Sequence, residues 1–107
     1  MSQNQPSTQA FAIGQLLAAI VLELRELVED QNTQHHFRIA LIRPSDGISS
    51  ALRALYHEMI NLDAEERTAV EARIAFAASP INRIDRNMRL DQGEFMRGYL
   101  QGIARGN

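Results

Sequence analysis

Apolar residues recur at spacings of three and four along the first third of the chain. The recurring positions are Phe11, Ile13, Leu16, Leu17, Ile20, Val21, Leu24, Leu27 and Val28. This period predicts one long amphipathic helix that begins at Thr8 or Gln9 and ends near Asp30. Gly14 lies inside it, where glycine costs about 1 kcal/mol relative to alanine. We therefore expect Gly14 to let a neighbouring backbone approach closely.

Polar breaks divide the next stretch into shorter helices. Residues 34–42 predict a short helix that Pro44 ends, because the residue before a proline is pushed out of the α region. A turn at 45–47 then supplies the cap of a third helix, which runs from about residue 48 to 61.

Asp63 and Glu66 form the pattern of a capping box, which predicts a fourth helix up to about Ala78. Candidates for its inward face are Val70, Ile74 and either Ala77 or Phe76.

The last part of the chain predicts two more helical segments. Ser79-Pro80 resembles a serine cap followed by proline, and it opens a short helix. The apolar stripe of this short helix is Ile81, Ile84 and Met88. A new start signal at 90–95 opens the final helix. Its buried face is drawn from Phe95, Met96, Tyr99, Leu100 and Ile103.

No segment alternates apolar and polar residues long enough to predict a strand. We therefore expect an all-α fold, a single-domain bundle of five or six helices over residues 10–104. Residues 1–9 are expected to be a flexible N-terminal tail and 105–107 a frayed C-terminus. A chain of 107 residues is long enough for one domain with a modest core.

Composition excludes several classes of protein. The chain has no cysteine, so a disulfide framework, a zinc-thiolate site and a thiol nucleophile are excluded. The longest apolar run, residues 16–22, is too short to span a bilayer. The first residues are polar and uncharged, unlike a signal peptide, and a cytoplasmic location is the expectation.

No motif for catalysis or metal binding is present. His35 and His36 are adjacent, so on a helix they point about 100° apart and chelate one metal poorly. We expect them and His57 to be exposed to solvent. No glycine-rich phosphate loop and no nucleophile elbow occur. The sequence predicts no catalytic, cofactor-binding or metal-binding residues and no enzyme.

Arginine supplies all 11 basic charges, against 13 acidic residues and a net charge of −2. The acidic residues concentrate on the first helix and at the start of the fourth. The candidate nucleic-acid-binding residues fall into two basic zones, Arg38, Arg43 and Arg53 in the first and Arg83, Arg86, Arg89 and Arg97 in the second. Guanidinium groups bind phosphate bidentately and stay charged. The alternative is ordinary surface arginine in a chain that avoids lysine.

Two stretches resemble a known family. Residues 10–18 (AFAIGQLLA) resemble the "A-Y-x-L-G-R-L-x-A" helix that opens the C-terminal region of the type I-C CRISPR large subunit. Residues 90–99 (LDQGEFMRGY) are similar to the closing "L-x-x-Q-G-x-F-x-L-G-Y-Y" of that region. Pro44 falls near the family's "A-T-P" turn. The chain departs from the family at Gln15, which stands where the family has arginine, and at Leu100-Gln101.

The resemblance implies a non-catalytic small subunit of a crRNA-guided Cascade complex. Such a subunit would contact copies of itself, neighbouring subunits and the DNA backbone, with the crRNA as a further candidate, and neither a membrane nor a small-molecule substrate. Its core or interface residues would be Phe11, Leu17, Phe95 and Tyr99, with close packing at Gly14, Gly93 and Gly98. The alternative is a helical protein-interaction module, an inhibitor or assembly factor that does not bind nucleic acid.

Overall fold

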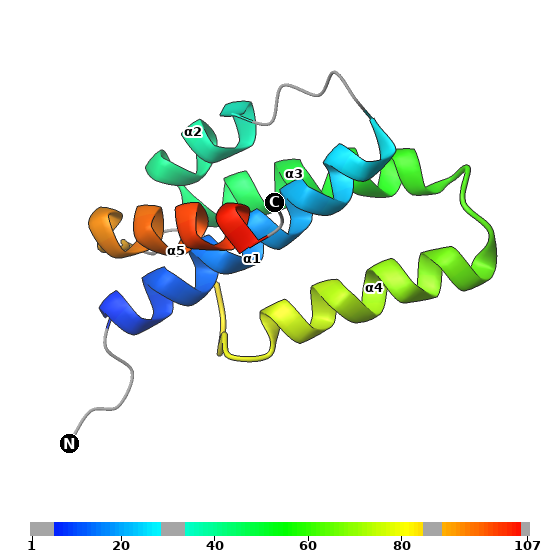
Figure 1. Cartoon of the computed structure of the whole chain (residues 1–107). Helices are drawn as coiled ribbons and strands as arrows, with labels where there is room; N and C mark the ends of the chain where they lie inside the picture. The colour runs from blue at the N-terminus through cyan, green and yellow to red at the C-terminus, as the bar shows by residue number, and fades with distance from the viewer. Residues whose placement is uncertain (1–5, 29–33, 85–88, 106–107) are drawn as a thin grey trace.

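The computed structural model describes residues 6–28, 34–84 and 89–105. These residues contain five α-helices and no strand, which confirms the expected all-α class (Figure 1). The helices are α1 (Pro6–Leu27), α2 (Gln34–Ile42), α3 (Pro44–Met59), α4 (Ala64–Ala78) and α5 (Gln92–Arg105). None of them is long and apolar enough to cross a membrane.

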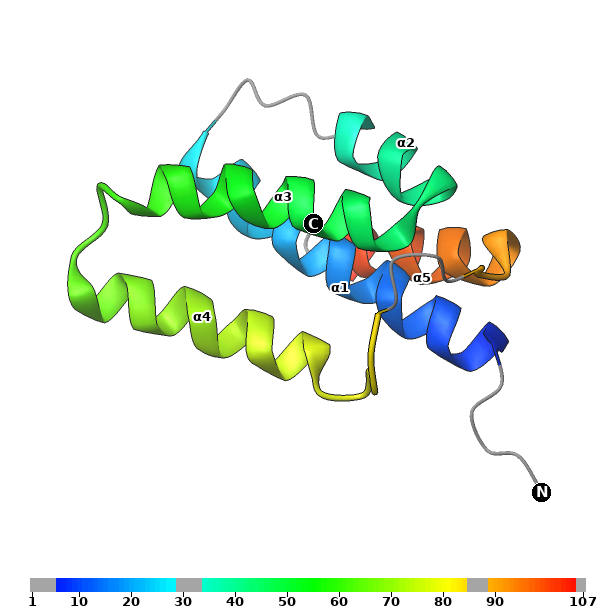
Figure 2. The same ribbon diagram turned by 180° about the vertical axis from the view of Figure 1, so that it is seen from behind.

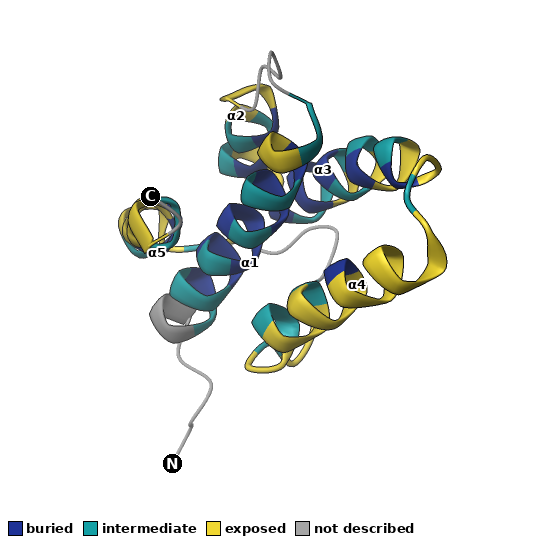
Figure 3. Ribbon diagram, turned by 45° about the vertical axis from the view of Figure 1, so that its right-hand side comes forward, coloured by how far each residue is buried: buried dark blue, intermediate teal, exposed yellow. Residues whose placement is uncertain are grey.

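Helix α1 is the centre of the bundle. It packs against α3, α4 and most extensively α5, while α2 packs on α3. Figure 2 shows the same arrangement from behind, with α3 and α4 running along α1. Figure 3 shows the buried positions following α1, with α5 on one flank and the largely exposed α4 on the other. The apolar stripe predicted for the first helix is therefore the core of the fold.

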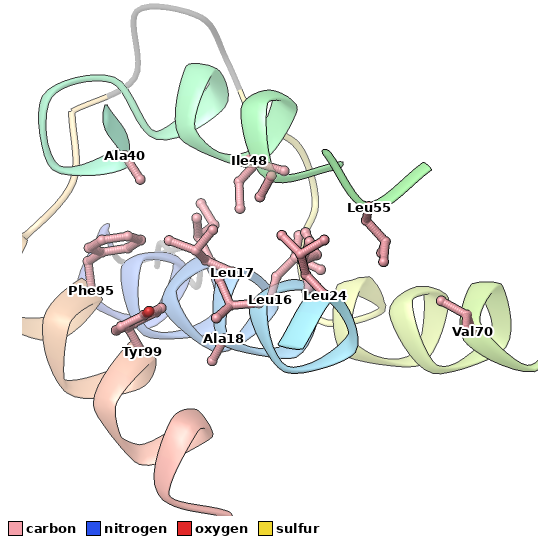
Figure 4. Close-up of a cluster of buried hydrophobic side chains, with 14 of the residues drawn as sticks. Leu16, Leu17, Ala18, Leu24, Ala40, Ile48, Leu55, Val70, Phe95 and Tyr99 are labelled. Carbon is pink, nitrogen blue, oxygen red and sulfur yellow. The ribbon is translucent and has the colours of Figure 1, made fainter. Parts of the chain in front are cut away.

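The core is built where side chains from the other helices meet α1. Leu17 and Leu24 of α1 are fully buried together with Leu55 of α3 and Phe95 of α5 (Figure 4). Val70 is the one buried residue that α4 contributes among its described positions. Burying a side chain of this size stabilises the fold by about 1.5–3 kcal/mol.

Helices α1 and α5 lie so close that Gly14 and Gly98 each face backbone of the other helix, and a Cβ atom on Gly102 would lie 2.6 Å from the Cβ of Ala18. A Cβ atom on Gly14 would lie 2.1 Å from the carbonyl oxygen of Phe95, and one on Gly98 would lie 2.2 Å from that of Phe11. Each glycine thus faces the carbonyl three residues before the other glycine. This confirms the close-packing role predicted for Gly14 and Gly98. Gly93 has no such role, because it is exposed.

Two helices begin earlier than their patterns predict. Helix α1 starts at Pro6, so residues 6–9 are helical rather than part of the tail expected over 1–9. Proline suits a first turn, where its missing N–H has no helical partner. Helix α3 starts at Pro44 rather than near residue 48. The extended Arg43 ends α2, and Pro44 opens α3 at once, so the turn expected at 45–47 is wrong.

Gly47 explains why this corner is tight. It lies in the first turn of α3, and a Cβ atom there would lie 2.3 Å from the Cβ of Ala40 on α2. The two helices therefore follow each other with a single extended residue, Arg43, between them.

The capping box of α4 is confirmed. The Asp63 side chain accepts the Glu66 N–H at 2.8 Å, and Glu66 accepts the Asp63 N–H at 3.3 Å. A similar bond from the Glu94 N–H to Asp91, 3.0 Å long, begins α5, which then continues through Arg105 rather than fraying there.

The short helix expected after Ser79-Pro80 is wrong over residues 81–84, which are not helical. The side chain of Gln9 holds this segment by accepting the Asn82 N–H at 3.3 Å and donating to the Pro80 carbonyl at 3.4 Å. A tertiary contact with α1 therefore replaces the local bonds that a helix would make. Met88 lies outside the described residues.

The close approach of α1 and α5 generates a stability prediction. Gly14→Ala and Gly98→Ala should each lower the free energy of unfolding by about 1–3 kcal/mol, because the new methyl group meets rigid backbone. Urea unfolding followed by circular dichroism measures the change.

Gly93→Ala is the matched control on α5. Its Cβ would meet nothing nearer than the Asp91 carboxylate oxygen at 3.4 Å. This variant should be neutral or stabilising by up to about 1 kcal/mol. Equal effects at all three positions would contradict the assigned role of the close helix contact.

Candidate functional site

The predicted arginines divide into those held by other side chains and those left exposed. Arg38 on α2, Arg53 on α3 and Arg89 before α5 are exposed and form no ion pair within the described residues. Arg43 lies 3.9 Å from the Asp46 carboxylate, a loose contact between two exposed side chains. An exposed pair of this kind contributes at most about 1 kcal/mol. Arg43 is therefore nearly as available to an anion as the first three.

Arg97 is held by two neighbours. Its guanidinium donates to Glu94 at 2.8 Å and 3.2 Å and lies 4.5 Å from the centre of the Phe11 ring. The hydrogen bond from Arg97 lowers the pKa of Glu94, and the same bond raises the pKa of Arg97. Arg97 thus connects α5 to α1, and a phosphate would have to compete with Glu94 for it.

One arginine of the second predicted basic zone, Arg89, lines a pocket between the end of α2 and the start of α5. This pocket of about 230 Å³ is lined by Ala40, Leu41, Ile42, Pro44, Arg89, Leu90, Gln92 and Phe95. Arg43 stands between two of these residues in the chain. Gln92 donates to the Leu41 carbonyl at 3.0 Å and so fixes the start of α5 against the end of α2.

The other two arginines of the second basic zone are Arg83 and Arg86, for which an exposed helix face is predicted. Arg83 is exposed in the non-helical segment after α4 and has an interaction partner. Arg86 lies outside the described residues. The exposed helix face predicted for this pair is thus not formed at Arg83, since residues 81–84 are not helical.

An apolar groove along α1 is the main surface feature that the sequence did not predict. Two adjoining hollows, of about 270 and 450 Å³, share the lining residues Ala19, Leu22, Phe76 and Ala77. Of the two candidates for the inward face of α4, Ala77 packs against the core, whereas Phe76 is 81% exposed at this groove. The signal available in the sequence was the weak amphipathicity of residues 64–78, because Ala72 and Phe76 fall away from the face of the helix that carries Val70.

One ion pair holds α4 to α1 beside the groove. Arg73 donates to Glu23 through Nε and also through Nη2, the second bond being 2.9 Å long. This hydrogen bond is the main cause that raises the pKa of Arg73. The pair fixes how far α4 stands from α1 at the groove.

His36 is buried, contrary to the expectation that the histidines are exposed. Its side chain is 4% exposed, its Nδ1 lies 2.9 Å from the Ser50 hydroxyl on α3, and its Nε2 is buried with no hydrogen-bond partner. Burial, and then the nearby His35, lower the pKa of His36. His35 and His57 are exposed as predicted. No group of three potential metal ligands occurs among the described residues.

Comparison with protein-family models, with curated proteins and with solved structures finds no match for this chain.

Burial of His36 predicts that stability falls on mild acidification. Since the pKa is lowered in the folded protein, the unfolded chain binds a proton at a pH where the folded chain does not. Stability is therefore full above the ordinary pKa of 6.5 and is lost as pH falls below it. The urea midpoint should drop between pH 7.5 and pH 5.5.

His36→Leu should remove most of this pH dependence, while His35→Gln, at the exposed neighbour, should retain most of it. An equal drop in the wild type and in His36→Leu would show that another group is responsible.

Proposed function

We propose that the chain is a non-catalytic small subunit of a crRNA-guided type I CRISPR effector complex. In this role it packs against neighbouring subunits and contacts the DNA backbone through exposed arginines. One observation carries the proposal. The two stretches that resemble the type I-C family, far apart in the chain, meet in space, because Gly14 of the first lies on Phe95 of the second and Gly98 lies on Phe11.

This meeting supports the resemblance because the matched residues act as a unit. Leu17, Phe95 and Tyr99 are buried, and Phe11 lies against Arg97. Phe95 and Tyr99 also stack on Phe37 of α2, with ring centres 5.7 Å and 4.5 Å apart. The motif pair therefore organises three helices.

The arginines that remain available support a backbone contact without base recognition. Arg38, Arg43, Arg53 and Arg89 are exposed. Phosphate contacts of this kind position a protein on DNA and carry no sequence information. In the proposed complex the crRNA supplies the sequence specificity.

A second candidate is a protein-interaction module that does not bind nucleic acid. The apolar groove at Phe76 favours it, because exposed apolar surface of this kind marks protein contacts. The net charge of −2 points the same way. In this reading the chain is an inhibitor or assembly factor that binds one protein partner.

Salt-dependent DNA binding separates the two candidates. Fluorescence anisotropy with labelled single- and double-stranded DNA should give a slope of log K against log[salt] between about −2 and −3, as expected for about three phosphate contacts. Arg38→Gln, Arg53→Gln and Arg89→Gln should each reduce the slope by about 1.

Arg67→Gln, an equal change of charge on α4, is the control and should leave the slope unchanged. Arg67 is exposed and donates to the Leu62 carbonyl at 3.0 Å. Binding that ignores salt, or no binding either alone or with the other subunits of the complex, would favour the protein-interaction module.

A further inference from the structure

The apolar groove lies between α4 and α5, over an uncovered strip of α1. Its floor is Ala19 and Leu22 of α1, one wall is Phe76 and Ala77 of α4, and the other wall includes Gly102 of α5. Most of these side chains are small, so the groove is open between two helices that flank a third. This is the shape that receives an additional helix.

The apolar wall of the groove comes from the face of α4 that points away from the core. Helix α4 turns Val70 toward the core and leaves Ala72 and Phe76 on the side of the groove. Its apolar residues therefore surround the helix instead of forming one stripe. A helix with two apolar faces is typical of one that is covered on both.

Charge at the rim differs between the two walls. On the α5 side the exposed Arg105 lines the groove. On the α4 side Arg73 is neutralised by its bond to Glu23, with Glu26 also close enough to raise its pKa. The unbalanced charge of the groove lining is thus positive and lies on the α5 wall.

We propose that this groove binds an amphipathic helix of a partner protein, with its apolar face on Leu22 and Phe76 and acidic residues facing Arg105. The inference deepens the proposed function, on which it rests, by naming the kind of partner that the subunit contacts. Phe76 is the anchor of the site, because large aromatic residues at the centre of an interface supply much of its binding energy.

The probe is a fluorescein-labelled helical peptide of about 16 residues, with leucine at i, i+4, i+7 and i+11 on one face and glutamate along one flank. A second peptide carries lysine in place of glutamate. The glutamate peptide should bind the full chain more tightly than the lysine peptide. Phe76→Ser should weaken binding about tenfold or more, and Arg105→Glu should reverse the preference between the two peptides.

Ile42→Ser is the matched control, because Ile42 is 82% exposed, against 81% for Phe76, and lines the separate pocket at Arg89. It should leave peptide binding unchanged, and circular dichroism checks that all variants remain folded. Equal binding of both peptides, or binding indifferent to Phe76→Ser, would overturn the inference. So would self-association that depends on Phe76, since the occupant would then be a second copy.

The peptide measurement and the DNA measurement test different proposals, so a negative result in one does not decide the other. If the chain binds DNA through its arginines but does not bind the peptide, the inferred partner helix is wrong and the proposed function is unaffected. If the chain binds the peptide but shows no salt-dependent DNA binding, the proposed DNA contact is wrong and the groove is still a protein-docking site.

Discussion

The fold depends on the contact of two backbones, those of α1 and α5. At Gly14 and Gly98 each helix presents bare backbone to a carbonyl group of the other, so there is no space for a side chain. This close approach carries Phe95 and Tyr99 to the positions where they stack on Phe37, and through Phe37 they hold α2. The placement of three helices therefore follows from a contact at which Gly14, Gly98 and Gly102 lack a side chain. Packing density of this kind leaves little tolerance for added volume.

The described arginines fall into two groups, those that connect one helix to another and those that stay exposed at the surface. Arg73 and Arg97 connect helices, the first by binding Glu23 across α1 and α4 and the second by lying over Phe11. Such residues are part of the architecture. Arg38, Arg53 and Arg89 contribute nothing comparable to the described structure. Exposed charges of this kind contribute little to folding stability.

Local patterns predicted most of the helices and little of the surface. The apolar spacing of residues 11–28 and the capping box at Asp63 depend only on residues close together in the chain, so the sequence alone predicts the helices they form. The segment 81–84 has the signals of a helix, but the Asn82 N–H and the preceding Pro80 carbonyl bond to the side chain of Gln9 on α1. The pattern left either Ala77 or Phe76 for the inward face of α4, and the position of the rest of the bundle places Ala77 against the core and leaves Phe76 exposed. The burial of His36 likewise depends on α3. Long-range packing decided each of these outcomes, and no local signal encodes it.

The pairing of α1 with α5 also sets the order in which the chain acquires its native structure. A ribosome delivers α1 first, and its partner arrives only after α2, α3 and α4 have been made. During that interval the glycine face of α1 has nothing to pack against, and its apolar stripe is incompletely covered. Contacts of such high sequence separation slow folding and prolong the exposure of apolar surface. The nascent chain is thus most open to chaperones before α5 emerges.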